Sequence, residues 1–368
     1  MIKQLLLTIL TGILVSSCTP EAEKAGMTID EVEFLDPSTI GGGDAPGGIT
    51  VTSEMITAAG ATELMVQKAA AYREASGAVN HRNGIYVYSG ATFDAYASNP
   101  EKLAARIAML GFKDVYLSPG TSRINSAADE LKRFISACTG YGIKVYAVAL
   151  GSLDNLVSES ATRSEVNAVT AYNGKVQMSQ RFAGISADLE PHTCHDSNKP
   201  SNIQYEWDSS TNYGKGKDND QLLHLTLNSL STAGTMLHTA GLKLGEAIFY
   251  NYQIYFNQGQ LDYGSTAQFL QSCDYLVTMA YLTTKDQIWE KSKPGIVAAG
   301  KKESVSVCVK TRINNDSGSS IQNLGWNNLL DVARYVNTQA ASYTSYRGFD
   351  MFTFDGIETM WQWTNDKN

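Results

Sequence analysis

The chain has 368 residues, enough for one large α/β barrel or for two ordinary domains. Hydrophobic residues make up 43% of the chain and charged residues 18%, which excludes wholesale disorder because a substantial core can form. The net charge of −8 argues against nucleic acid as a partner, since a protein that binds phosphates along a strand needs a basic surface.

The first residues have the pattern of a targeting segment. Lys3 supplies a charged start, and residues 5–15 are an apolar run too short for a relaxed membrane span. The run ends in Leu14-Val-Ser-Ser-Cys18, which resembles a bacterial lipoprotein signal. The resemblance implies a signal peptide over residues 1–17, lipidation of Cys18, and an outer-membrane lipoprotein facing the periplasm or the cell surface, because Thr19 rather than Asp follows the cysteine. An ordinary secretory signal with an incidental cysteine is the alternative.

A linker and a helix are predicted before the main domain. Residues 18–52 are acidic and contain the glycine-rich stretch 41–48, so we expect a flexible linker that keeps the domain away from the lipid surface. Ser53 is expected to cap a lead-in helix that runs to about residue 74, is broken by Gly60, and packs outside the main fold.

Strand-like and helix-like segments alternate from residue 84 onward. Strands are predicted over 84–90, 114–118, 144–150, 182–191, 244–252, 275–281, 304–309 and 348–354. Helices are predicted over 100–110, 126–141, 162–180 (interrupted near Gly174), 221–240, 266–272, 285–299 (cut by Pro294), 327–341 and 358–363.

Eight strands with helical crossovers predict a parallel sheet. Eight repeats over about 280 residues fit a closed (β/α)8 TIM barrel, the α/β fold that we expect over about 84–363 of a domain spanning 53–368. The alternative is an open doubly wound sheet. That fold requires a glycine-rich phosphate loop after the first strand, and residues 89–92 do not form one.

The fourth predicted strand ends in two carboxylates. Alternation places Ser186, Asp188 and Glu190 on one strand face, which in a barrel is the inward one. The C-terminal strand ends of such a barrel build the active site. Two neighbouring carboxyls raise each other's pKa, so that one can stay protonated as a general acid. An acidic loop after a buried strand is the alternative.

The other strand ends supply aromatic and amide side chains. The ends are expected to present Tyr88 and Ser89, Ser118, Tyr250, Asn251 and Tyr252, Tyr281, and Phe352, Phe354 and Asp355. Together with the carboxylate pair they fit a sugar site. No cofactor is expected, no histidine and carboxylate cluster has the spacing of a metal hydrolase, and no Gly-x-Ser-x-Gly elbow is present.

The cysteines and the polar insertion leave other options open. Cys138, Cys273 and Cys308 are expected to be buried free thiols. Cys194 lies between His192 and His195 in the insertion 192–220, and this trio suggests either a metal site or, with better support, a polar loop. Trp207 of the same insertion is a candidate sugar contact.

Two strands together resemble the family-18 glycoside hydrolases, which include chitinases and endo-β-N-acetylglucosaminidases. Their fourth strand carries Asp-Gly-x-Asp-x-Asp-x-Glu, matched here by Ala183-Gly-Ile-Ser-Ala-Asp-Leu-Glu190. Their sixth strand carries Met-x-Tyr, matched here by Met279-Ala-Tyr281. The first two acids of the motif are replaced by Ala183 and Ser186, and Leu282 stands where an acidic residue is frequent.

The resemblance implies roles for single residues. Glu190 would be the general acid, Asp188 would orient the acetamido group of the substrate, and Tyr281 would hydrogen-bond the acetamido oxygen. Phe352 would form the floor of the subsite in place of a tryptophan. The remaining expected sugar contacts are Tyr88, Tyr250, Asn251, Met279 and Trp207.

The implied activity is substrate-assisted, retaining hydrolysis of glycans that contain N-acetylhexosamine, such as chitin-like oligomers or the N-glycan core. A catalytically impaired lipoprotein that binds glycans at the cell surface is one alternative. A hydrolase of another barrel family is a second, with Asp355 as the best candidate for its second acid.

Overall fold

The computed structural model describes residues 48–90, 92–208, 214–312 and 319–365. Its strands form one closed parallel barrel in chain order, from β1 to β8, which confirms the predicted (β/α)8 fold and excludes the open doubly wound sheet. The strands are β1 Gly84–Tyr88, β2 Asp114–Ser118, β3 Lys144–Ala149, β4 Gly184–Ala187, β5 Lys243–Phe249, β6 Tyr275–Met279, β7 Val305–Lys310 and β8 Tyr346–Phe352.

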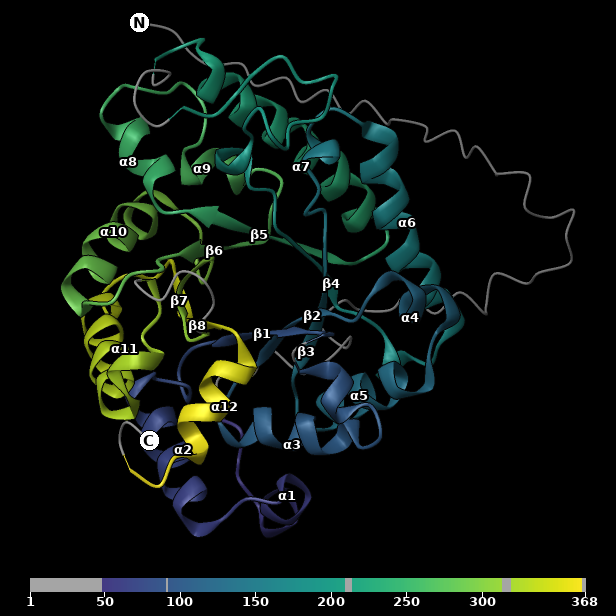
Figure 1. Cartoon of the computed structure of the whole chain (residues 1–368), viewed down its shortest axis with the longest axis vertical. Helices are drawn as coiled ribbons and strands as arrows, with labels where there is room; N and C mark the ends of the chain where they lie inside the picture. Colours follow the sequence, from purple (N-terminus) through teal and green to yellow (C-terminus); the bar gives the residue numbers. More distant parts are fainter. Residues whose placement is uncertain (1–47, 91, 209–213, 313–318, 366–368) are drawn as a thin grey trace, which may run out of the picture. The chain divides into compact units, whose positions relative to one another are not determined.

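Helices surround the barrel, as Figure 1 shows. They are α1 Ser53–Ala59, α2 Glu63–Ala75, α3 Pro100–Met109, α4 Thr121–Ser126, α5 Asp129–Gly140, α6 Glu159–Lys175, α7 Asp218–Thr239, α8 Asn251–Asn257, α9 Thr266–Phe269, α10 Lys285–Ala298, α11 Trp326–Ala340 and α12 Phe354–Gln362. Short polar side chains start several of them, because an unpaired backbone N–H in the first turn needs an acceptor. Ser158 caps α6 and Thr284 caps α10 in this way.

Tyrosines fill the middle of the barrel. The ring of Tyr116 lies 4.7 Å from that of Tyr86, 6.1 Å from Tyr146 and 6.0 Å from Tyr275, measured between centroids. Glycine in the barrel wall makes room for these rings: a Cβ on Gly245 would lie 2.2 Å from the ring of Tyr275. The barrel therefore has a packed centre that separates its two mouths.

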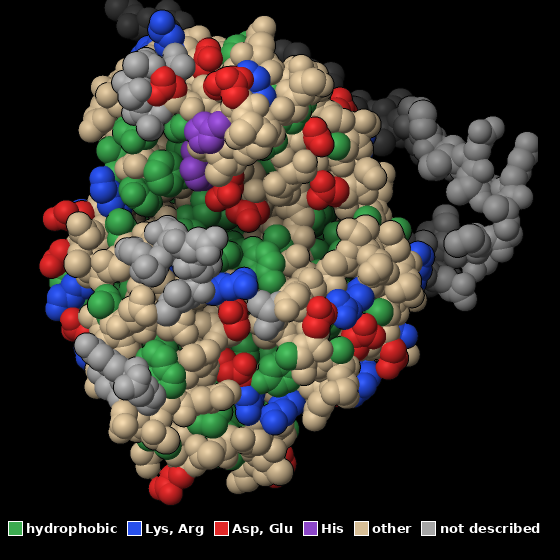
Figure 2. Space-filling view, viewed as in Figure 1, with side chains coloured by type: hydrophobic (Ala, Val, Ile, Leu, Met, Phe, Trp, Pro, Cys, Tyr) green, Lys and Arg blue, Asp and Glu red, His purple; other side chains and the backbone are tan. Residues whose placement is uncertain are grey.

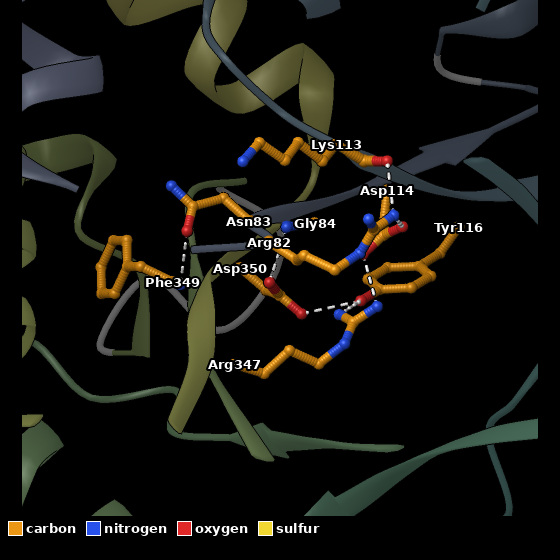
Figure 3. A network of polar contacts seen from close by, with 9 residues as sticks. All are labelled: Arg82, Asn83, Gly84, Lys113, Asp114, Tyr116, Arg347, Phe349 and Asp350. Carbon is orange, nitrogen blue, oxygen red and sulfur yellow. Dashed lines mark hydrogen bonds and ion pairs between the residues drawn. The ribbon is translucent and has the colours of Figure 1, made fainter. Parts of the chain in front are cut away.

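A polar network closes the barrel at the end where the strands begin (Figure 3). Buried Asp114 accepts hydrogen bonds from Arg82 and Arg347. Buried Asp350 accepts from the backbone N–H of Gly84 (2.6 Å) and from the hydroxyl of Tyr116 (2.9 Å). These contacts tie β8 to β1 and β2, so this mouth contributes to stability.

The lead-in segment is divided at Gly60 as predicted, because Gly60 adopts a left-handed conformation (φ 58°) between helices α1 and α2. Its cap differs from the prediction: Thr52 rather than Ser53 caps the first helix. The segment packs outside the barrel as predicted: the Trp361 indole donates a hydrogen bond of 2.6 Å to the Met65 carbonyl.

The helix predictions have different outcomes. Helix α10 runs continuously through Pro294, since buried Trp289 and Ile296 on either side of the proline anchor it and outweigh the missing N–H. The interruption predicted near Gly174 is confirmed, because α6 ends at Lys175 and a separate 3-10 turn covers Met178–Gln180. The helix predicted over 126–141 is α5 and starts at Asp129, because Ala127 adopts a left-handed conformation (φ 49°) after the additional short helix α4.

The predicted signal peptide, Cys18 and most of the predicted linker lie outside the described residues. Within the described ranges, no helix has both the length and the apolar character needed to span a bilayer. The four cysteines Cys138, Cys194, Cys273 and Cys308 are buried free thiols, as predicted for three of them.

Candidate active site

The carboxylates of the acidic stretch lie at the C-terminal mouth of the barrel. Strand β4 ends at Ala187, so Asp188 and Glu190 follow it directly and precede the short 3-10 turn Pro191–Thr193. The side chain of Glu190 is 36% exposed, which leaves its carboxyl open to a ligand. Figure 2 shows acidic and histidine side chains gathered beside hydrophobic ones near the middle of the barrel.

Burial shifts the titration of both carboxyls upward. It raises the pKa of Asp188 to about 6 and that of Glu190 to about 7, the charge of Asp188 adding to the second shift. Two carboxyls so close titrate as a pair. The pair therefore loses its last proton only near neutral pH, so a protonated fraction, the state required of a general acid, is still present there.

An aromatic group lies around the carboxyl pair. The ring of Phe352, at the end of β8, lies 5.6 Å from that of Tyr88 and 5.5 Å from that of Tyr281. Burial, with a further contribution from the nearby charge of Asp188, raises the pKa of both tyrosines. The structure therefore brings together four predicted site residues from β1, β4, β6 and β8. Met279 ends β6 and is buried two residues before Tyr281.

A second aromatic group lies on the other side of Glu190. His192 stacks on Phe249 with a centroid separation of 4.7 Å, and its Nδ1 lies 2.8 Å from the hydroxyl of Tyr252. Its Nε2 is 3.9 Å from Glu190 Oε1. Burial lowers the pKa of His192 to about 4, so that near pH 7 the ring is neutral and places no positive charge beside Glu190.

Three predicted sugar contacts do not lie at the end of a strand. Tyr250 and Asn251 begin helix α8, because the β5–β6 ladder stops at the pair Phe249 and Met279. Trp207 is 6% exposed, and its ring lies 5.6 Å from that of Tyr252. Trp207 therefore packs against Tyr252, the residue that contacts His192.

Glu246 is a site residue that sequence reasoning missed. It is fully buried in β5, beside Ala187 of β4, and its Oε1 accepts a hydrogen bond of 3.2 Å from the backbone N–H of Leu189. Burial, with the charge of Asp188, raises the pKa of Glu246 well above its ordinary range. The available signal was an acid inside the apolar run 244–249.

Backbone contacts fix Glu190 from both sides. Glu246 holds the N–H of Leu189 on one side. On the other, the carbonyl of Glu190 accepts hydrogen bonds from the backbone N–H (2.9 Å) and the hydroxyl (2.8 Å) of Thr193. A cavity of ≈ 320 Å³ adjoins this turn, lined by Thr193, Lys199 and residues 151–154. It offers a polar extension of the site.

The histidine and cysteine trio has a structural role. The thiol of Cys194 faces the carbonyl of Tyr205 at 3.7 Å, and His192 Nδ1 is engaged by Tyr252. No group of three His, Cys, Asp or Glu side chains suited to a metal ion occurs in the described part of the chain.

Asp355 lies in the first turn of α12, where Thr353 donates to it and Arg312 lies 3.5 Å away.

No protein-family model matches the chain, and no curated protein matches it. Among solved structures, a family-18 (GH18) chitinase from Pseudoalteromonas aurantia aligns with a TM-score of 0.50 at 13% identity, over 76% of this chain and 97% of that one. A chitinase from Chromobacterium violaceum ATCC 12472 aligns with a TM-score of 0.45 at 12% identity, over 76% and 96% of the two chains. An endo-β-N-acetylglucosaminidase from Cordyceps militaris aligns with a TM-score of 0.40 at 12% identity, over 84% and 90%. The alignment with the Pseudoalteromonas aurantia enzyme shows that the chain shares its barrel fold with a family-18 chitinase.

Proposed function

We propose that the protein is a glycoside hydrolase that acts on glycans containing N-acetylhexosamine, either chitin-like oligomers or the N-glycan core. The observation that carries this proposal is the carboxyl pair at the end of β4, where burial raises the pKa of Asp188 to about 6 and that of Glu190 to about 7 beside an aromatic wall. A fold alone does not assign an activity, so the proposal rests on this site.

Glu190 is the general acid of the proposed reaction. Its proton passes to the glycosidic oxygen as the bond between that oxygen and the anomeric carbon breaks. The 2-acetamido oxygen of the substrate attacks the anomeric carbon in place of a protein nucleophile. Water then opens the cyclic intermediate and returns a proton to the Glu190 carboxylate, which gives a product of retained configuration.

Asp188 and Tyr281 orient the acetamido group. Asp188 accepts the acetamido N–H, and the hydroxyl of Tyr281 donates to the acetamido oxygen. Both side chains lie in the same electrostatic surroundings, since the charge of Asp188 contributes to the raised pKa of Tyr281. Holding the oxygen near the anomeric carbon makes the attack intramolecular, which is where a large part of such rate enhancement arises.

Aromatic faces form the sugar subsites in this proposal. Phe352 is the floor under the reacting sugar, with Tyr88 beside it and Met279 in the wall. Tyr250 and Asn251 at the start of α8 contact a neighbouring unit, and Trp207 contributes through His192. Neutral His192 lets Glu190 keep its raised pKa, because a cation at 3.9 Å would lower it.

A comparison of matched oligomers tests the participation of the acetamido group. Wild-type protein is expected to cleave N-acetylated chitopentaose and to leave the fully deacetylated pentamer intact, since the latter lacks the attacking oxygen. Equal cleavage of both oligomers would contradict the substrate-assisted mechanism.

Glycan binding without cleavage is the second candidate function. The observation that favours it is Ser186, which is buried on β4 two residues before Asp188 and carries a hydroxyl where a carboxyl could exchange a proton with Asp188. No second carboxyl on β4 is thus available to exchange a proton with Asp188. Calorimetric binding of chitopentaose by wild-type protein with no product over days would establish this function instead.

We also propose that the protein is an outer-membrane lipoprotein anchored through Cys18, on the basis of the leader pattern at residues 1–18. Labelled palmitate is expected to be incorporated into wild-type protein in a bacterial host and not into Cys18→Ser. Equal labelling of the two proteins would contradict the assignment.

A further inference from the structure

A cavity of ≈ 470 Å³ opens at the N-terminal mouth of the barrel, the opposite end from Asp188 and Glu190. Its lining comes from the starts of the strands: Lys113 immediately precedes β2, Lys243 begins β5, and residues 301–303 lead into β7. Six cations line it, Arg82, Lys113, Lys243, Lys301, Lys302 and Arg347. Asp274 and Glu303 are the carboxylates in the lining.

The two arginines already have a counter-charge. Figure 3 shows Arg82 and Arg347 directed toward Asp114. The Arg82 guanidinium is 2.6 Å from one carboxylate oxygen of Asp114, and Arg347 contacts the other. One carboxylate thus serves two guanidinium groups, and Asp350 of the same network also interacts electrostatically with Arg347.

Three lysines at the cavity have no such partner. No ion pair within 4 Å joins Lys113, Lys243 or Lys301 to a carboxylate within the described ranges. Lys301 donates to the carbonyl of Cys273 at 3.1 Å, and Lys113 lies 3.5 Å from that of Val79. An ammonium group has three N–H donors, so donors remain for a ligand.

The two carboxylates of the lining form contacts with groups other than Lys113, Lys243 and Lys301. Asp274 Oδ2 accepts from the backbone N–H of Leu244 (2.9 Å) and lies 3.0 Å from His238 Nε2. Glu303 pairs with Lys302 at 3.2 Å. The cavity therefore keeps an excess of positive charge on a chain whose net charge is −8.

A concave wall of unpaired cations favours an anion, because low-dielectric walls concentrate the field. Burial and the charge of Arg82 lower the pKa of Lys113, and the nearby charges of Asp114 and Glu303 offset only part of this effect. Lysine binds phosphate as a point charge. The volume is within the range of small-molecule sites.

We propose that this N-terminal cavity binds a small molecule that carries a phosphate group, held by Lys113, Lys243 and Lys301. Inorganic phosphate or pyrophosphate and a phosphorylated metabolite present the same oxyanion to these lysines. The proposal does not depend on the glycosidase activity, because the site lies at the other mouth of the barrel.

Calorimetry with the full-length protein tests this site. Inorganic pyrophosphate and inorganic phosphate are titrated separately at constant ionic strength. Wild type is expected to bind pyrophosphate saturably at one site and phosphate more weakly. The double variant Lys243→Gln/Lys301→Gln is expected to lose at least about tenfold in pyrophosphate affinity, while Lys293→Gln, on the exposed face of α10, stays as wild type.

Two controls separate binding from folding and from the proposed activity. The double variant should keep the wild-type melting temperature without ligand; if it does not, the single variants Lys243→Gln and Lys301→Gln replace it. Glu190→Gln should bind pyrophosphate as wild type does. No saturable binding by wild type, or undiminished binding by the lysine variants, would overturn the proposal.

Discussion

At the scale of single residues, the protonation of Glu190 governs the proposed chemistry. Burial and Asp188 raise the pKa of Glu190 to about 7, and an acid is active below its pKa. We expect kcat/KM for chitopentaose to fall about tenfold for each pH unit above 7. A pH–rate profile of wild-type protein measures this. A profile that stays flat to pH 9 would exclude Glu190 as the acid in its observed surroundings.

Glu246 acts on the site through the backbone and is a positioning residue. Its Oε1 accepts the N–H of Leu189, between Asp188 and Glu190. Glu246→Gln keeps an acceptor, so near-wild-type activity and an unchanged pH profile are expected. Glu246→Met removes the acceptor, and a loss of about tenfold or more in kcat with little change in KM is expected.

Steady-state kinetics of the two Glu246 variants provide the measurement, with melting temperatures as the folding control. Loss of activity in both variants to the same extent would mean that Glu246 takes part through its proton. Wild-type kcat in Glu246→Met would remove it from the site altogether.

The sequence could predict one part of the site and not the other. Alternation along one strand is a local pattern, so it identified Asp188 and Glu190, and strand ends identified Tyr88, Tyr281 and Phe352. The contact between Glu246 and Leu189 depends on the register of β5 against β4, with Glu246 beside Ala187, which no local pattern encodes. The neutral state of His192 depends in the same way on burial by Phe249 and Tyr252.

At the scale of elements, the strands were predictable because their outward positions are apolar and their crossovers are helical. The ends of the strands were less predictable. The expected strand 244–252 stops at Phe249 because its neighbour β6 offers no partner beyond Met279, and helix α8 starts there. Helix boundaries at Gly60 and Pro294 depended on backbone conformation and tertiary packing.

Strand β5 contains a glycine that the barrel requires. A Cβ on Gly245 would meet the Tyr275 ring at 2.2 Å in the packed centre. Gly245→Ala is expected to lower the free energy of unfolding by about 1–3 kcal/mol through overpacking. Gly140→Ala in α5, where nothing lies within 4 Å of the new Cβ, is the matched control and should not destabilise. Urea unfolding measures both; equal stability of the two variants would contradict the packing described for the barrel centre.

At the scale of the whole molecule, the two mouths of the barrel have opposite electrostatic character. The C-terminal mouth carries the carboxyl pair and aromatic walls, and the N-terminal mouth carries cations around Asp114. The tyrosine layer lies between them. A shared fold at 13% identity preserves the barrel and not its side chains, so each mouth has to be understood from its own residues.

The closure of the barrel depends on Asp114. Burial raises its pKa, but Arg347 and Arg82 overcome this effect and hold the pKa below its usual value. Asp114→Asn removes the carboxylate charge that both largely buried guanidinium groups contact, and a loss of about 3–5 kcal/mol in the free energy of unfolding is expected. Asp331→Asn, which breaks an exposed pair with Lys285, should change it little. Urea unfolding measures the free energy of unfolding of both variants. A wild-type free energy for Asp114→Asn would contradict the role of the network.

The proposed glycosidase activity depends on Glu190 as its general acid. Its most direct measurement is the release of reducing ends from chitin oligomers and from high-mannose N-glycans by wild-type protein beside Glu190→Gln, with glycan binding of both proteins followed by calorimetry. Wild type is expected to cleave at least one substrate. The variant is expected to lose at least about a hundredfold in cleavage rate and to retain glycan binding. Cleavage that survives in Glu190→Gln, or no cleavage by wild type that binds the glycans, would contradict it.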